Sequence, residues 1–193
     1  MGKGRLEAFS DGVIAIIITI MVLGLKVPHE TGWAALRELV PSLVSYALSF
    51  VFIGIYWNNH HHLLQAIHRV NGGILWANTH LLFWLSLIPF VTVWTGENLL
   101  APLPVALYGV VLLFAAFAYF ILVRSLMWHH GEDSTLAIAV GGDSKGKISL
   151  VLYAAAIPLT MVSTWMSLGL YAVVAVIWLI PDRRIEKAMS KRR

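Results

Sequence analysis

The stretch that decides the fold is RLEAFSDGVIAIIITIMVL, residues 5–23. Its first seven residues carry charges and a hydroxyl, and the rest is a run of mostly branched aliphatic residues without a charge. A helix over residues 10–25 is of roughly membrane-spanning length, because a bilayer core takes about 20 apolar residues. Charge held at the boundary of such a segment is costly and usually has a partner. The start of the chain therefore predicts a first membrane helix with polar groups at its head.

The composition of the chain indicates an all-α integral membrane protein. Hydrophobic residues make up 59% of the 193 residues, which is far too many for a soluble domain. Cysteine is absent, so the sequence offers neither a disulfide nor a thiolate metal ligand. Six of the fourteen Lys and Arg residues lie in the last eleven positions. Such a tail is typical of a topology determinant beside anionic lipid and not of a nucleic-acid interface. We therefore expect a transmembrane domain at residues 1–182 and a basic cytoplasmic tail at 183–193.

Hydropathy and the positions of proline and tryptophan predict a bundle of six transmembrane helices. The expected spans are residues 10–25, 39–57, 73–94, 103–128, 148–165 and 168–180. The last two spans are short, so residues 148–180 could instead form one re-entrant hairpin. Of the fourteen basic residues, only Lys26 and Arg37 fall on the far side of this arrangement, which leaves twelve on the N-terminal side. By the positive-inside rule, both termini are expected in the cytoplasm.

The first helix has two faces of different character. At about 100° per residue, one stripe holds Gly12, Ile16, Thr19, Ile20 and Leu23, and the opposite side holds Asp11, Ala15, Ile18 and Val22. If the aliphatic stripe faces a conduction path, Asp11 turns towards neighbouring helices and becomes a hydrogen-bonding centre near the cytoplasmic mouth. Arg5 and Asp11 are six residues apart, which is the wrong spacing for a pair along one helix face. Each is therefore expected to find a partner on another helix or another subunit.

Several motifs resemble the transmembrane-protein-175 family of potassium channels. R-x-x-x-F-S-D at the head of the first span resembles the family signature, and its residues are Arg5, Phe9, Ser10 and Asp11. The segments YWNNHH (56–61), WAN (76–78), LSLIP (85–89) and WTGEN (94–98) resemble later parts of the family pattern. The chain departs from that pattern at His80, where the family is usually apolar.

The resemblance implies a potassium-selective or potassium-preferring leak channel. Its pore would be lined by the first helices of four identical single-repeat subunits, with the motif residues as an assembly network. Ile16 would form the constriction, Thr19 would also face the pore, and Ile20 and Leu23 would add apolar rings. A narrow aliphatic ring can gate by dewetting, because it makes a column of water unstable. Potassium ions would be the permeant species, and no cofactor is implied.

A run of histidines follows the second span. His60, His61 and His62 are consecutive, so their side chains point about 100° apart and cannot all bind one ion. A zinc site needs about four converging ligands, so we expect no metal site and instead a polar cap that bonds to Ser10 and Asp11. Histidine titrates near neutral pH, so this cap could make opening sensitive to cytoplasmic pH. Three further polar candidates are Asn58 near the same end, and Asn78 and His80 at membrane depth, which are expected to hold helices together.

The residues alone leave two other functions open. A small-solute transporter would commonly show inverted internal repeats, and residues 1–98 and 99–193 show no convincing similarity. An accessory subunit of another membrane complex is the second alternative. An enzyme is not expected, because the spans contain no paired carboxylates and no Ser-His-Asp spacing. The short loops and the absence of a targeting signal favour a multi-pass protein of a prokaryotic plasma membrane, with the lipid bilayer and copies of itself as partners.

Overall fold

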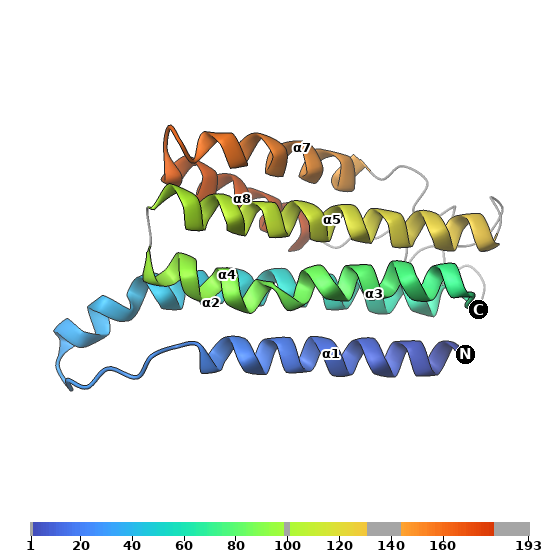
Figure 1. Cartoon of the computed structure of the whole chain (residues 1–193), viewed down its shortest axis with the longest axis horizontal. Helices are drawn as coiled ribbons and strands as arrows, with labels where there is room; N and C mark the ends of the chain where they lie inside the picture. The colour runs from blue at the N-terminus through green and yellow to red at the C-terminus, as the bar shows by residue number, and fades with distance from the viewer. Residues whose placement is uncertain (1, 99–100, 131–143, 180–193) are drawn as a thin grey trace.

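The computed structural model describes residues 2–98, 101–130 and 144–179, and the predicted tail at 183–193 lies outside them. Every regular element in the described residues is a helix. These helices are α1 (Lys3–Leu23), α2 (Trp33–Gln65), α3 (Gly72–Ser86), α4 (Ile88–Glu97), α5 (Pro102–His130), α7 (Ser144–Leu159) and α8 (Thr164–Leu179). They run side by side along the long axis of the molecule (Figure 1). The predicted all-α fold is confirmed.

Six helical segments are present in the described residues, because α3 and α4 together form one rod. Four segments are long and apolar enough to cross a membrane, namely α1, α2, α3 with α4, and α5. The last two helices have 16 residues each. The predicted boundary between them is wrong, since α7 ends at Leu159 and α8 begins at Thr164. After Leu159 the N–H groups of Thr160, Met161 and Val162 bond to carbonyls three residues back, which forms the tight turn that ends α7.

Two segments contain a proline that disturbs the helix. The 33-residue α2 is longer than the predicted span 39–57 and contains Pro41. Its first turns project beyond the rest of the bundle, as Figure 1 shows in pale blue. Between α3 and α4 the helix is interrupted at Leu87, two residues before Pro89. Proline has no N–H to offer the carbonyl of Leu85, so the rod is weakened at that point.

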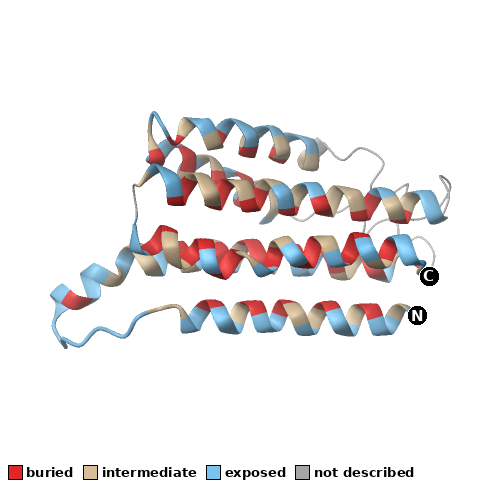
Figure 2. Cartoon of the chain, viewed as in Figure 1, coloured by how far each residue is buried: buried red, intermediate tan, exposed pale blue. Residues whose placement is uncertain are grey.

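The segments form layers, and α1 lies along one edge of the bundle (Figure 1). It contacts α2, α3 and α4, while α3 and α4 also contact α5, which in turn packs against α7 and α8. Buried residues line the sides on which neighbouring helices face each other (Figure 2). On α1 they are Leu6, Ser10, Ile14, Ile17 and Met21. This spacing of three or four residues produces a single buried face, so α1 is held by the bundle on one side only.

Candidate ion-conduction surface

The side of α1 that faces away from the bundle, which we call the open side, is mostly aliphatic. Ile16, Ile20 and Leu23 are 59%, 53% and 77% exposed, and Gly12 and Thr19 are exposed beside them. These five residues are the stripe that the sequence predicts. The hydroxyl of Thr19 donates a hydrogen bond to the carbonyl of Ala15 in its own helix (2.9 Å). The open side is therefore a set of aliphatic side chains with one hydroxyl oxygen among them.

The open side is wider than the predicted stripe. The sequence analysis assigns Ala15 and Val22 to the face opposite the stripe, and this prediction is wrong, because both are exposed. Ala15 is three residues from Gly12, which places it only about 60° around the helix. Asp11 and Ile18 are partly buried at the margin of the bundle. The narrow buried face of α1 thus leaves about half of its residues exposed.

A chain of hydrogen bonds fixes the buried face of α1. Ser10 is fully buried, donates to the carbonyl of Leu6 (2.9 Å) and accepts from Nδ2 of Asn78 on α3 (3.0 Å). Oδ1 of the same Asn78 lies 2.7 Å from Nε2 of the buried His60 on α2, so Nε2 donates there. We call Ser10, Asn78 and His60 the Ser10 network. Because every member is bonded in an apolar interior, rotating α1 would leave buried polar groups without partners.

Two carboxylates of α1 contact α2 beside this network. Asp11 accepts a hydrogen bond from the indole N–H of Trp57 (3.0 Å), and Oε1 of Glu7 lies 3.4 Å from Nδ1 of His61. The ring of His61 stacks on Trp57 with centroids 5.9 Å apart. The sequence predicts that the histidines bond directly to the head of the first helix. Their predicted partners are Ser10 and Asp11, but His60 reaches Ser10 only through Asn78, and the partner of His61 on that helix is Glu7. The contact of Asp11 with Trp57 is not predicted from the sequence either.

Two residues of the predicted assembly network lie on the open side. Arg5 and Phe9 are four residues apart and both exposed, and Phe9 is 54% exposed. Within the part of the chain that the structure describes, no carboxylate forms an ion pair with Arg5. The structure therefore divides the R-x-x-x-F-S-D residues, because Ser10 and Asp11 bond to the bundle while Arg5 and Phe9 face away from it.

The other predicted polar residues lie outside the Ser10 network. Asn58 is exposed, and His62 is partly buried with a buried Nδ1 that has no hydrogen-bond partner among the described residues. His80 accepts a hydrogen bond from the indole N–H of Trp84, one turn along the same helix (3.0 Å). The described residues contain no group of three or more His, Cys, Asp or Glu side chains that could hold a metal ion.

A second buried polar cluster, which the sequence analysis does not predict, lies further from the N-terminal end. Oγ of Ser49 on α2 lies 2.8 Å from the hydroxyl of Tyr108 on α5 and 2.6 Å from Oγ1 of Thr92 on α4. All three residues are at most 3% exposed. Thr92 also lies 3.8 Å from Sδ of Met21 on α1. The partners are 43 and 59 residues apart along the chain, so no local spacing could reveal them.

Known proteins are similar to this chain in sequence. Residues 5–89 match the family model described as endosomal/lysosomal potassium channel TMEM175. A potassium channel of Chryseobacterium sp. (strain P1-3) is 52% identical over 191 residues, which are 99% of this chain and 100% of that protein. A potassium channel of Chamaesiphon minutus is 31% identical over 190 residues, 90% of this chain and 91% of that protein.

A solved structure shares the fold. The crystal structure of a lysosomal potassium-selective channel TMEM175 homologue from Chamaesiphon minutus matches with a TM-score of 0.80 at 30% identity. The match covers 93% of this chain and 97% of that one. The family and these relatives are named as ion channels, which confirms the prediction that the protein is not an enzyme. This multi-pass membrane protein belongs to the transmembrane-protein-175 (TMEM175) family.

Proposed function

We propose that the chain is one subunit of a homotetrameric leak channel that prefers potassium, with a pore lined by the open side of α1. The relatives named as potassium channels support this activity. The observation that carries the proposal is the contrast on α1, where a broad aliphatic side stands open while the Ser10 network fixes the other side. A helix held in this way presents the same residues to its neighbours in every copy.

Four copies around an axis would turn each open-side residue into a ring. Ile16, Ile20 and Leu23 would form successive apolar rings in which a water column is unstable, so small movements of α1 would open or close the path. The hydroxyl hydrogen of Thr19 is used in its bond to Ala15, so its oxygen lone pairs are available to a passing cation. In this proposal the aliphatic rings set the barrier, and Thr19 supplies the oxygen ligand closest to it.

The proposal places the N-terminal end of the bundle in the cytoplasm. At this end α1, α3 and α7 begin and α2, α5 and α8 end (Figure 1). Of the fourteen basic residues, twelve belong to this side in the predicted arrangement, and Lys26 and Arg37 belong to the far end. Basic residues favour the cytoplasmic side. The proposed setting is a prokaryotic plasma membrane, with residues 183–193 as a basic cytoplasmic tail.

Single-cysteine variants test whether α1 lines the path. The chain has no cysteine, so Ile16→Cys needs no prior substitutions. Val176→Cys on α8 is a matched control, since Val176 is 57% exposed against 59% for Ile16. A cationic methanethiosulfonate reagent needs a hydrated thiolate, so it should block potassium current through Ile16→Cys and leave Val176→Cys unchanged. Equal responses of the two variants would contradict the proposed pore.

Reversal potentials test the ion preference. With potassium on one side of a planar bilayer and sodium on the other, the parent protein should reverse towards the potassium equilibrium potential. Ile16→Asn makes the constriction polar and should raise the conductance and move the reversal potential towards zero. Parent-like selectivity in this variant would remove Ile16 from the pore.

Saturable solute flux without unitary currents would favour a transporter, and failure of the purified chain to form a closed oligomer would favour an accessory subunit.

A further inference from the structure

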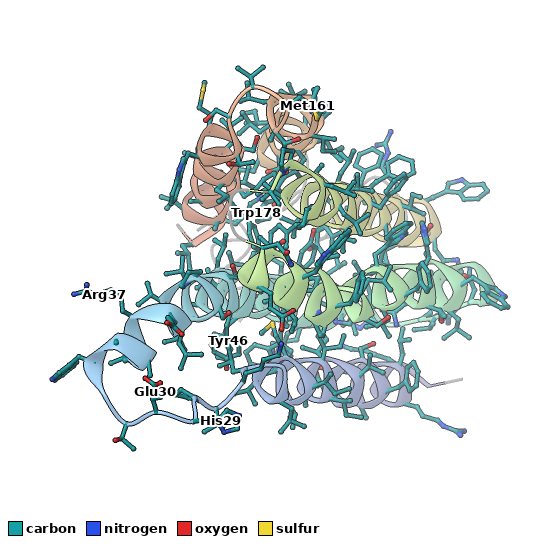
Figure 3. The ribbon with its side chains drawn as sticks, turned by 60° about the vertical axis from the view of Figure 1, so that its left-hand side comes forward. His29, Glu30, Arg37, Tyr46, Met161 and Trp178 are labelled. Carbon is teal, nitrogen blue, oxygen red and sulfur yellow. The ribbon has the colours of Figure 1, made fainter. Side chains whose placement is uncertain are left out.

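A cleft far from the open side of α1 lies between α2, α5, α7 and α8, in the half of the bundle nearest the N-terminal end. It encloses about 40 Å³ and is partly open to the surroundings. Its walls are mostly apolar and aromatic, and include Phe52, Ala116, Phe120 and Leu150. Trp178, labelled in Figure 3, closes one side, where its indole N–H donates to Ser149 on α7 (2.8 Å). The cleft therefore has the lining of a hydrocarbon site.

Two buried tyrosines give this cleft an unusual polar character. Tyr56 on α2 and Tyr153 on α7 both line it and are only 9% and 2% exposed, yet neither hydroxyl has a hydrogen-bond partner among the described residues. Two other buried tyrosines are bonded, because Tyr108 pairs with Ser49 (2.8 Å) and Tyr171 donates to the carbonyl of Val105 (3.1 Å). Buried hydroxyls are normally bonded, so the two exceptions require an explanation.

The two hydroxyls are not sealed off. Among the described residues, the one fully enclosed polar side-chain atom without a partner is Nδ1 of His62. The hydroxyl oxygens of Tyr56 and Tyr153 therefore keep some contact with open space, and the cleft is the space that both residues line. Two hydroxyl donors from different helices thus lie at one apolar cleft. This arrangement suits an elongated apolar molecule that carries an acceptor oxygen.

The position of the cleft identifies the class of molecule. Trp178 lines the cleft, and Trp57 follows the lining residue Tyr56 on α2. Tryptophan favours the interface between hydrocarbon and headgroups. Lipid ester carbonyls lie at that level and accept hydrogen bonds. At the start of α7, Gly146 lines the cleft between Lys145 and the exposed Lys147, so positive charge lies where a lipid phosphate would sit.

We propose that this cleft binds one anionic diacyl phospholipid from the leaflet at the N-terminal end. One acyl chain lies along the aromatic wall, an ester carbonyl accepts from the hydroxyls of Tyr56 and Tyr153, and the headgroup lies beside Lys147. The lipid joins α2, which carries His60 of the Ser10 network, to the peripheral helices α5, α7 and α8. Its site is separate from the proposed pore, so a result that contradicts one proposal does not contradict the other.

Ester-linked and ether-linked lipids test the proposal directly. Diacyl phosphatidylglycerol and its diether analogue have the same chains and headgroup, but only the diester has carbonyl acceptors. After detergent exchange, native mass spectrometry should show that the parent protein retains the diester about tenfold better, as expected for two net hydrogen bonds. Equal retention of the two lipids by the parent would overturn the proposal, and this comparison needs no variant.

Tyrosine variants then locate the site. Tyr56→Phe combined with Tyr153→Phe removes both hydroxyls while keeping the ring shapes, so the preference for the diester should disappear. Tyr46→Phe is the matched control, since its hydroxyl also has no described partner but lines a separate cavity of about 630 Å³ at the other end of the bundle. It should keep the preference. A preference that persists in the double variant, or that is lost equally in Tyr46→Phe, would overturn the assignment of the cleft.

Discussion

The two sides of α1 differ in how closely the rest of the chain specifies them. On the buried side, Ser10 is bonded through Asn78 to His60, and the carboxylate of Asp11 is bonded to Trp57. On the open side, the hydroxyl of Thr19 bonds only within its own helix. The rotation of α1 about its own axis is therefore fixed by polar groups on its buried side, which do not line the proposed pore. Changes on the buried side should act on stability, whereas changes on the open side should act on assembly and conduction.

The largest expected effect is that of Asn78→Leu. This change removes both the donor to Ser10 and the acceptor of His60, and leaves two buried polar groups without that partner. We expect a loss of about 2 kcal/mol in the free energy of unfolding. This value lies between the cost of leaving polar groups unpaired in a water-excluded core and the smaller worth of hydrogen bonds between membrane helices. Thermal unfolding in detergent, followed by tryptophan fluorescence, measures it.

Thr79→Ala is the control for this variant. Thr79 is the next residue on α3, but it is exposed and its hydroxyl bonds to the carbonyl of Leu75 in its own helix. Its removal should change the unfolding free energy by less than about 0.5 kcal/mol. Similar losses in the two variants would mean that the Ser10 network does not hold α1 more firmly than an ordinary surface hydroxyl does.

Hydropathy could predict the helical segments, but it could not predict which polar groups meet. A run such as residues 12–23 indicates a membrane helix through its length and composition alone. Ser10 and Asn78 are 68 residues apart, and only the packing of α1 on α3 brings them together. The helical period correctly grouped Ile16 with Leu23, yet it misplaced Ala15, because the width of the open side depends on how few helices contact α1.

Functional roles were harder to predict than positions. The sequence predicts Asp11 as the hydrogen-bonding centre, whereas among the described residues Asp11 has Trp57 as its side-chain partner, and Ser10 bonds to Asn78, which also bonds to His60 and so joins three helices. A buried serine gives little signal in a sequence, because small residues at helix contacts usually serve packing alone. Ser49 is a second such residue, and it bonds to both Tyr108 and Thr92.

A smaller loss is expected from Ser49→Ala. The second buried cluster joins α2, α4 and α5, but it reaches α1 only through the sulfur of Met21. Thr92 also lies 2.6 Å from the carbonyl of Ile88, so it keeps a partner when Ser49 is removed. Only Tyr108 then loses its bond, and we expect about 1 kcal/mol in the same unfolding measurement. Ser86→Ala, which removes an exposed hydroxyl bonded to Phe83, is the control. A loss equal to that of Asn78→Leu would contradict the ranking of the two clusters.

The smallest effect on stability, and the sharpest test of the open side, is expected from Gly12→Ala. A Cβ built at Gly12 meets no atom within 4 Å in the chain, and the same is true of Gly54 on α2. Alanine favours a helix over glycine by about 0.5–1 kcal/mol, so both variants should keep or slightly raise the unfolding free energy. If four α1 helices surround a pore, however, the methyl group at residue 12 faces other copies or the ion path. Gly12→Ala should therefore lower the potassium conductance or the tetramer fraction, while Gly54→Ala changes neither. Normal conductance and assembly in Gly12→Ala would place the open side of α1 against lipid and would break the contrast between its two sides.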